Sequence, residues 1–119
     1  GNYFVFFKID GGTTWNVRSR NGTETETNDT GITAGGAAYH KFKIEIDNEG
    51  SGASNIEAKF FIDTGTGWQR CRDATTNVPI AHTILIASST EMNAGAYVKA
   101  GGANSEVLTV DYLYASQKR

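Results

Sequence analysis

Acidic side chains at alternate positions are the first residues in this sequence whose types could do chemistry. Glu45, Asp47 and Glu49 have the spacing Glu-x-Asp-x-Glu, and in a strand this spacing places the three carboxyl groups on one face. Retaining hydrolysis of a glycosidic bond needs two carboxyl groups about 5 Å apart, and a strand can supply that separation. Lys43 precedes them on the same face, however, and Gly50 indicates a turn at Glu49. The sequence therefore favours a solvated strand of mixed charge, and we expect no enzymatic activity.

Nucleophilic catalysis has few candidate residues. The chain has two histidines, His40 and His82, and one cysteine, Cys71, whereas a Ser-His-Asp or Cys-His site needs an imidazole beside a nucleophile on an exposed turn. No Gly-x-Ser-x-Gly motif is present. We expect a solvated or backbone-bonded His40, a structural His82, and a Cys71 without a functional role.

Metal sites are also weakly indicated. Neither histidine has a second ligand at a typical zinc spacing. Calcium is bound by carboxylate oxygens, and acidic residues in predicted loops are the candidate ligands. The sequence contains no EF-hand loop. We interpret these acids as solvated turn residues and expect no metal and no cofactor; they are Asp10, Asp47, Asp63 and Asp73.

Carbohydrate binding remains an alternative, because sugar rings stack on exposed aromatic faces and form hydrogen bonds with planar polar groups. Two sets of residues could serve. The first is Trp68 with Arg70 and Arg72, and the second is Asn16, Arg18 and Arg20 on the outer face of the strand that contains Trp15. Arginines at alternate positions are more often a solvated sheet face, and Trp15 is more often a core residue.

Composition limits the class of protein. The chain has 119 residues, a formal net charge of −2 and 39% apolar residues, which fits one globular domain over residues 1–119. Nucleic acids and anionic membranes attract concentrated basic surfaces, so we expect neither as a partner. The longest apolar run, Tyr3 to Phe7, is far shorter than the ~20 residues of a membrane-spanning helix.

Apolar residues recur with period two between clusters of Gly, Asn, Asp, Ser and Thr, which predicts short antiparallel strands joined by turns. The pattern gives about eight strands, the number typical of a sandwich or jelly roll. We expect strands over Tyr3–Asp10, Thr13–Arg20, Tyr39–Asp47, Ile56–Asp63, Gly67–Arg72, His82–Ala87, Gly95–Lys99 and Glu106–Tyr114, with a weak edge strand and an exposed loop in Asn21–Ala38.

The alternation also predicts the core and one further buried face. Tyr3, Val5 and Phe7 form a second apolar face on the first strand, and we expect a subunit contact there. The residues expected to face the core are Phe4, Phe6, Trp15, Val17, Phe42, Ile44, Ile46, Ala58, Phe60, Ile62, Ile84, Ile86, Val98, Leu108, Val110 and Tyr112.

Four segments together resemble a known family. They are Trp15–Thr25, Tyr39–Ile46, Ala58–Asp63 and Leu108–Tyr114, and they are similar to successive strands of concanavalin A-like jelly-roll domains of bacteriophage virion proteins. Such domains usually have further strands before the position of Gly1. The resemblance therefore implies that this chain is the C-terminal part of a longer one, or that another subunit covers its exposed sheet.

The resemblance implies a function through assembly. It suggests a non-enzymatic virion module, such as a head decoration, tail or fibre component, with contacts to other virion proteins or to copies of itself and with possible adhesion to a glycan. The alternative is a carbohydrate-binding module of a secreted or cell-surface protein.

Overall fold

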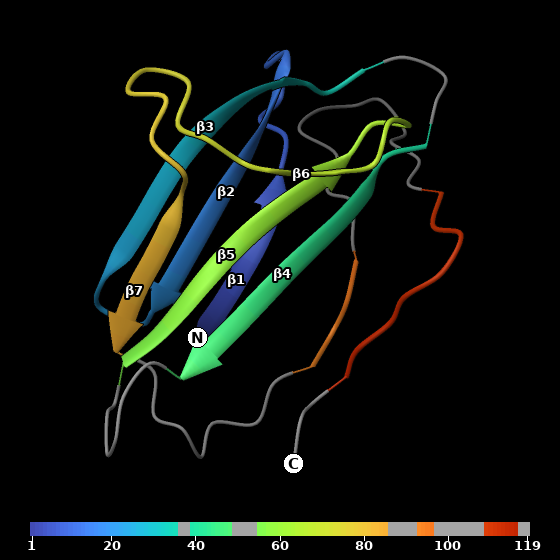
Figure 1. The fold of residues 1–119 in the computed structure, drawn as a ribbon. Coiled ribbons are helices and arrows are strands. Elements are labelled where there is room, and N and C mark those ends of the chain that lie inside the picture. The colour runs from blue at the N-terminus through green and yellow to red at the C-terminus, as the bar shows by residue number, and fades with distance from the viewer. Residues whose placement is uncertain (36–38, 49–54, 86–92, 97–108, 117–119) are drawn as a thin grey trace. The chain divides into compact units, whose positions relative to one another are not determined.

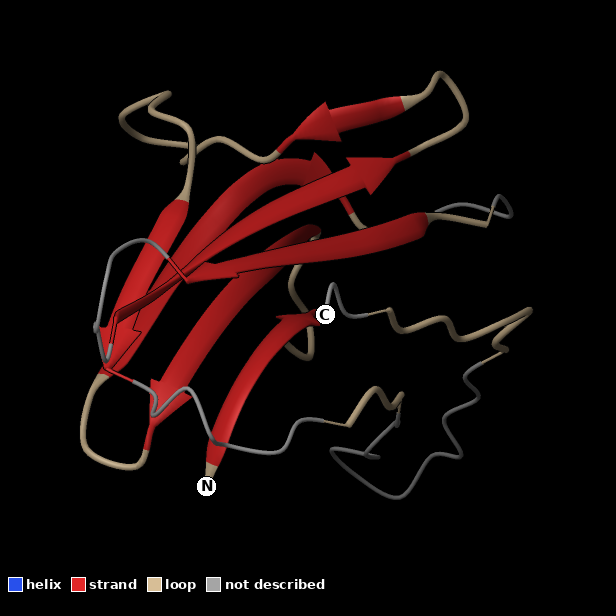
Figure 2. Cartoon of the chain, turned by 60° about the horizontal axis from the view of Figure 1, so that its bottom comes forward, coloured by secondary structure: helices blue, strands red, loops and turns tan. Residues whose placement is uncertain are grey.

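The computed structural model describes residues 1–35, 39–48, 55–85, 93–96 and 109–116, and these contain strands and no helix (Figure 1, Figure 2). The chain divides into two units, Gly1–Ser88 and Ser89–Arg119, and the described strands all lie in the first. The strands are β1 (Asn2–Phe7), β2 (Thr14–Asn21), β3 (Thr25–Thr33), β4 (Lys41–Asn48), β5 (Asn55–Asp63), β6 (Trp68–Arg70) and β7 (Ala81–Leu85).

The first sheet has the order β1-β2-β3, and both strand pairs are antiparallel. A tight turn joins β1 to β2. Gly11 has a φ of 72°, which glycine adopts without steric cost, and the Gly12 N–H donates to the Ile9 carbonyl over 2.9 Å. β3 lies at the edge of this sheet, in the segment where the sequence predicts a weak edge strand.

The second sheet is built around β5. β4 pairs with β5 over its length, β7 pairs with the Asn55–Lys59 half and β6 with the Phe61–Asp63 half. The predicted pairing of the two amphipathic strands is confirmed, with Ile44 opposite Phe60.

The two sheets pack face to face as a β-sandwich, so the expectation of an all-β, antiparallel fold is confirmed. Val17 of β2 packs with Ala58, Phe60 and Ile62 of β5, and none of these four side chains is exposed. The Phe6 ring meets the Phe60 ring edge-on, with centroids 5.5 Å apart. The core is completed by Cys71 and Ile80, with Phe4, Trp15, Ile32 and Ile44 partly buried against it.

In the described part of the chain, no strand covers the side of the sandwich formed by the edge strands β1 and β4. Phe42 and Ile46 lie on the inner face of β4, as predicted, yet they are 40% and 39% exposed. The Phe42 ring contacts Phe6 of β1 with centroids 5.0 Å apart, and no other described strand pairs with either edge. The prediction that Phe42 and Ile46 are buried is therefore wrong. We call Phe4, Phe6, Phe42 and Ile46 the open apolar edge.

The two C-terminal strand predictions fail where the structure describes them. Residues 93–96 and 109–116 contain no strand, and Val110 and Tyr112 are 44% and 64% exposed instead of facing the core. Alternation predicts a face, but a strand also needs a partner for its backbone hydrogen bonds. The side chain of Ile84 and residues Ile86, Val98 and Leu108 lie outside the described part.

Two adjacent phenylalanines test which face of β5 carries the stability. Phe60→Ala should lower the free energy of unfolding by about 3–5 kcal/mol, because it opens a cavity in the core. Phe61→Ala, the matched control on the outer face, should cost about 1 kcal/mol or less. Urea denaturation of both variants measures the difference, and equal losses would contradict the assignment of faces.

Candidate functional site

The acidic residues of β4 form ion pairs on a solvated surface. Lys43 Nζ lies 2.9 Å from Glu45 Oε1, and Lys59 Nζ lies 4.0 Å from Asp47 Oδ2. Glu45 and Asp47 are exposed, and Glu49 lies outside the described residues. The mixed-charge face predicted for this strand is present, and each described carboxylate of the motif has a lysine beside it.

Four polar residues form a hydrogen-bonded chain that begins at the buried Ser19 and His82 and ends at the partly exposed Asn28 and Asp73, and we call it the buried polar chain. Ser19 Oγ lies 2.6 Å from His82 Nδ1, His82 Nε2 lies 2.8 Å from Asn28 Oδ1, and Asn28 Nδ2 donates to Asp73 Oδ2 over 2.7 Å. These residues come from β2, β7, β3 and the loop between β6 and β7, so the chain joins both sheets. Figure 1 shows that loop in yellow, next to β3.

The direction of each hydrogen bond follows from the acceptor at its end. A carboxylate only accepts, so Asn28 donates to Asp73 through Nδ2 and turns Oδ1 toward His82. Because Oδ1 also only accepts, Nε2 of His82 carries the ring proton. The bare Nδ1 then accepts from the Ser19 hydroxyl. All three bonds run from Ser19 toward Asp73.

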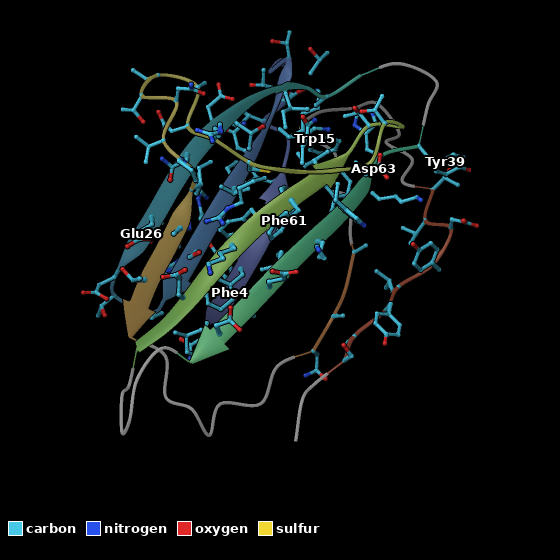
Figure 3. All side chains as sticks on the ribbon, in the orientation of Figure 1. Phe4, Trp15, Glu26, Tyr39, Phe61 and Asp63 are labelled. Carbon is cyan, nitrogen blue, oxygen red and sulfur yellow. The ribbon has the colours of Figure 1, made fainter. Side chains whose placement is uncertain are left out.

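Burial keeps the imidazole in this chain neutral. Desolvation lowers the pKa of His82 from 6.5 to about 4. Hydrogen bonds from Asn28 and from the backbone of Thr76 and Thr75 lower the pKa of Asp73 to about 2. The only described carboxylate near Nδ1 is Glu26, at 3.9 Å, and Figure 3 labels it on the β3 side, beside β7.

The buried polar chain has residue types found in nucleophilic triads, but its location does not suit catalysis. Ser19 has no exposed surface and His82 is 2% exposed, so a substrate cannot reach the hydroxyl. Burial also raises the pKa of the Cys71 thiol to about 12, which keeps the thiol protonated and unreactive. The geometry supports a structural role for His82.

Sequence reasoning did not identify Ser19, Asn28 and Asp73 as partners of His82. The sequence pattern could have identified one of them. Ser19 continues the series of alternate positions Trp15 and Val17, which predicts that its polar side chain also points into the sandwich. The pairing itself depends on the approach of β7 to β2 and β3, which no local pattern specifies.

A shallow pocket of about 220 Å³ lies at the Asp73 end of the chain. Among the described residues that line it, Asp73 alone is charged, and the Asp73 Oδ1 atom already accepts from the N–H groups of Thr75 and Thr76. The carboxylate therefore holds its own loop. The lining residues are Asn28, Asp73, Thr76, Val78, Pro79, Ile80 and Ala81.

The first proposed sugar-binding set lies on the outer face of the second sheet. Trp68 is 46% exposed, and Lys43 Nζ lies 5.2 Å from its ring centroid and 4.4 Å from that of Phe61, which Figure 3 labels on β5. Arg70 lies 5.6 Å from the Phe61 ring and donates to the Ile80 carbonyl over 2.8 Å. Arg72 binds the Asn77 carbonyl, so both arginines also support the β6–β7 loop.

The second set lies on the outer face of the other sheet, together with the expected subunit contact. β2 residues Asn16, Arg18 and Arg20 stand opposite Phe7, Val5 and Tyr3 of β1. The Arg18 guanidinium lies 4.6 Å from the Phe7 ring centroid and its Nε donates to Thr27 Oγ1 over 3.0 Å. The core separates this face from Trp68. The six proposed sugar-binding residues therefore occupy two surfaces.

Asp63 and Asp73 act as turn residues, as predicted, whereas the prediction is wrong for Asp47, which lies within β4 and forms an ion pair with Lys59. Asp63 Oδ1 accepts from the N–H groups of Gly65 and Gly67, and these bonds lower the pKa of Asp63. Within the described ranges, no three His, Cys, Asp or Glu side chains are grouped to hold a metal ion. The same ranges contain no helix long and apolar enough to cross a membrane.

His40, predicted to be solvated or backbone-bonded, has a side-chain partner instead. Its Nδ1 accepts from the indole N–H of Trp15 over 3.0 Å, which holds the start of β4 against β2.

Comparisons with known proteins identify no relative of this chain. No protein-family model matches the chain, and the comparisons with curated proteins and with solved structures give no match.

Acidification from pH 6.5 to pH 4 should destabilise the fold. The unfolded state binds a proton at the ordinary histidine pKa of 6.5, but the folded state does so only near 4. The contribution of His82 is therefore complete above pH 6.5 and decreases as the pH falls through this window. The difference between the two pKa values corresponds to roughly 3 kcal/mol.

Urea denaturation at several pH values measures this loss. His82→Gln should flatten the dependence of stability on pH between 4 and 6.5, whereas the control His40→Gln should retain it. An unchanged slope in His82→Gln would assign the effect to another group.

Proposed function

We propose that this chain is a non-enzymatic structural or decoration module of a virion, built on a jelly-roll sandwich and acting through protein–protein contacts. The observation that carries the proposal is the uncharged edge strand β1. Assembly needs complementary surface area and a free edge, and it does not need titratable chemistry. The proposed location is the virion particle, with other virion proteins or further copies of the chain as partners.

β1 differs from the other outer strands in how its edge is protected. Natural proteins block free edges with charges or with a covering segment. β4 carries four charged residues and β3 carries Glu26 and Asp29. On β7, the Thr83 N–H donates to the Glu26 carboxylate. The six residues of β1, Asn2–Phe7, include no charge, which favours pairing at this edge.

The apolar surface near β1 supports the same proposal. Tyr3, Val5 and Phe7 are only half-buried on the outer face, and the open apolar edge lies on the inner face. Phe42 and Ile46 keep about two-fifths of their surface accessible. A contact at β1 would remove apolar surface from water on both faces of the strand, at roughly 25 cal/mol per Å².

Carbohydrate binding is the second candidate, and the exposed Trp68 favours it. Lys43 lies over the rings of Trp68 and Phe61, and Arg70 lies over the Phe61 ring. This sheet face therefore combines aromatic rings with polar groups, which suits a sugar. Lys43 already contacts both rings, so a ligand would share them with this cation.

Incorporation into particles tests the proposed function. Val5→Lys places a charge on β1 and should reduce the amount of the chain in purified virions by tenfold or more. Thr25→Lys, on the opposite edge of the same sheet, is the matched control and should be incorporated normally. Quantitative mass spectrometry of the particles measures both. Absence of the wild-type chain from virions would contradict the proposal.

A glycan array tests the second candidate. If Trp68 binds a sugar, the wild-type chain should retain a glycan and Trp68→Ala should lose at least tenfold in affinity, because a stacking surface is removed. Thr25→Ala, an exposed position on β3 that belongs to neither candidate set, should bind normally. An array without any retained glycan, or binding unaffected in Trp68→Ala, would remove this candidate.

A further inference from the structure

We infer that the partner of β1 is β1 of a second copy of this chain, paired antiparallel about a two-fold axis so that two three-stranded sheets become one six-stranded sheet. The inference rests on the proposed function, since it names the partner of the same contact. It uses only residues of the first unit.

The backbone of β1 supplies the hydrogen-bonding groups for this pairing. In the described residues β1 pairs with β2 on one edge and is the end strand of its sheet. An end strand directs alternate N–H and C=O groups outward. When two copies of the strand pair antiparallel, the outward N–H and C=O groups of each copy bond to those of the other. The contact is then the same on both partners, as isologous dimers require.

Alternation along β1 selects the register. Residues directly opposite each other in a sheet share a face, and a slip by one residue would place inner residues outside. Centring the axis on Val5 sets Phe4 opposite the partner's Phe6 and Tyr3 opposite the partner's Phe7. Centring it on Phe4 also preserves the faces, but it sets the polar Asn2 opposite the partner's Phe6. We therefore assign the register centred on Val5.

Charge does not oppose this arrangement. β1 carries no charged side chain, and the nearest cations on the outer face, Arg18 and Arg20, belong to β2. The two β2 strands of such a dimer are three strand spacings apart, about 14 Å. This separation exceeds the Debye length of about 8 Å at physiological ionic strength, so repulsion between the two arginine rows is screened.

The size of the contact sets its expected strength. A standard interface buries about 800 Å² on each partner over roughly 20–30 residues. β1 offers six residues, and Phe42, whose ring contacts Phe6 of β1, adds to them. The contact is at the low end of the range, so we expect a dimer that dissociates at micromolar concentration, with a Kd of roughly 1–100 μM.

Sedimentation velocity of the full chain from about 1 μM to 1 mM tests the inference. The wild type should pass from monomer to dimer. Val5→Lys should weaken dimerisation at least tenfold, because it sets two like charges opposite each other at the axis. Thr25→Lys should dimerise like the wild type. Circular dichroism checks that both variants are folded.

A cysteine variant tests the register without weakening the strand. Residues directly opposite in an antiparallel pair have Cα atoms about 4.5–5.5 Å apart, within the range for a disulfide. Val5→Cys should therefore form a linked dimer under mild oxidation, and the exposed control Thr25→Cys should do so far more slowly. The native Cys71 is buried and should not react.

Several outcomes would overturn the inference. A wild type that is monomeric up to about 1 mM, or a dimer unaffected by Val5→Lys, excludes the β1–β1 contact. Slow hydrogen exchange of β1 in a monomer would show that another segment occupies the edge. A monomer whose Val5→Lys variant is lost from virions would overturn the second copy as partner and leave the proposed function standing. No effect of Val5→Lys on either measurement would overturn both.

Discussion

The inner row of β5 is the contact on which the other parts of this sandwich depend. Ala58, Phe60 and Ile62 are completely buried, and the strand that carries them pairs with β4, β6 and β7. Val17 of the opposite sheet packs onto the same row. Close packing of these side chains fixes the distance and alignment of the two sheets. The alignment of the sheets in turn sets the positions of the polar side chains between β3 and β7.

The two sides of the sandwich are built differently as a consequence. At the β3–β7 side, Ser19, His82 and Asn28 fill the space between the sheets, and each finds a hydrogen-bond partner. At the β1–β4 side the inner residues are aromatic or aliphatic, and water reaches Phe42 and Ile46. A new group placed among these three side chains would displace a satisfied hydrogen bond. An open apolar side can accept such a group.

The sequence predicts those parts of the fold that depend on local alternation. Polar and apolar residues alternate along β4, and along β5 except at Phe61, and this alternation predicts that the two strands pair and which side chains lie on their inner faces. It does not predict that β5 also pairs with β6 and β7. The same reasoning failed for Val110 and Tyr112, which alternate equally well but are exposed. It also could not join Ser19 to His82, which are 63 positions apart, since the hydrogen bond depends on how two sheets stack.

The direction of the buried polar chain has a consequence for how this protein opens. Each hydrogen bond in it polarises the next, and removal of Ser19, His82 or Asn28 would leave a buried imidazole nitrogen or hydroxyl without its partner. The Ala74 N–H also donates to the Asp29 carbonyl, so the β6–β7 loop is tied to β3 at a second point. Local fluctuations that free the loop alone are therefore costly. We therefore expect the β6–β7 loop, β7 and the part of β3 that carries Asn28 and Asp29 to open together.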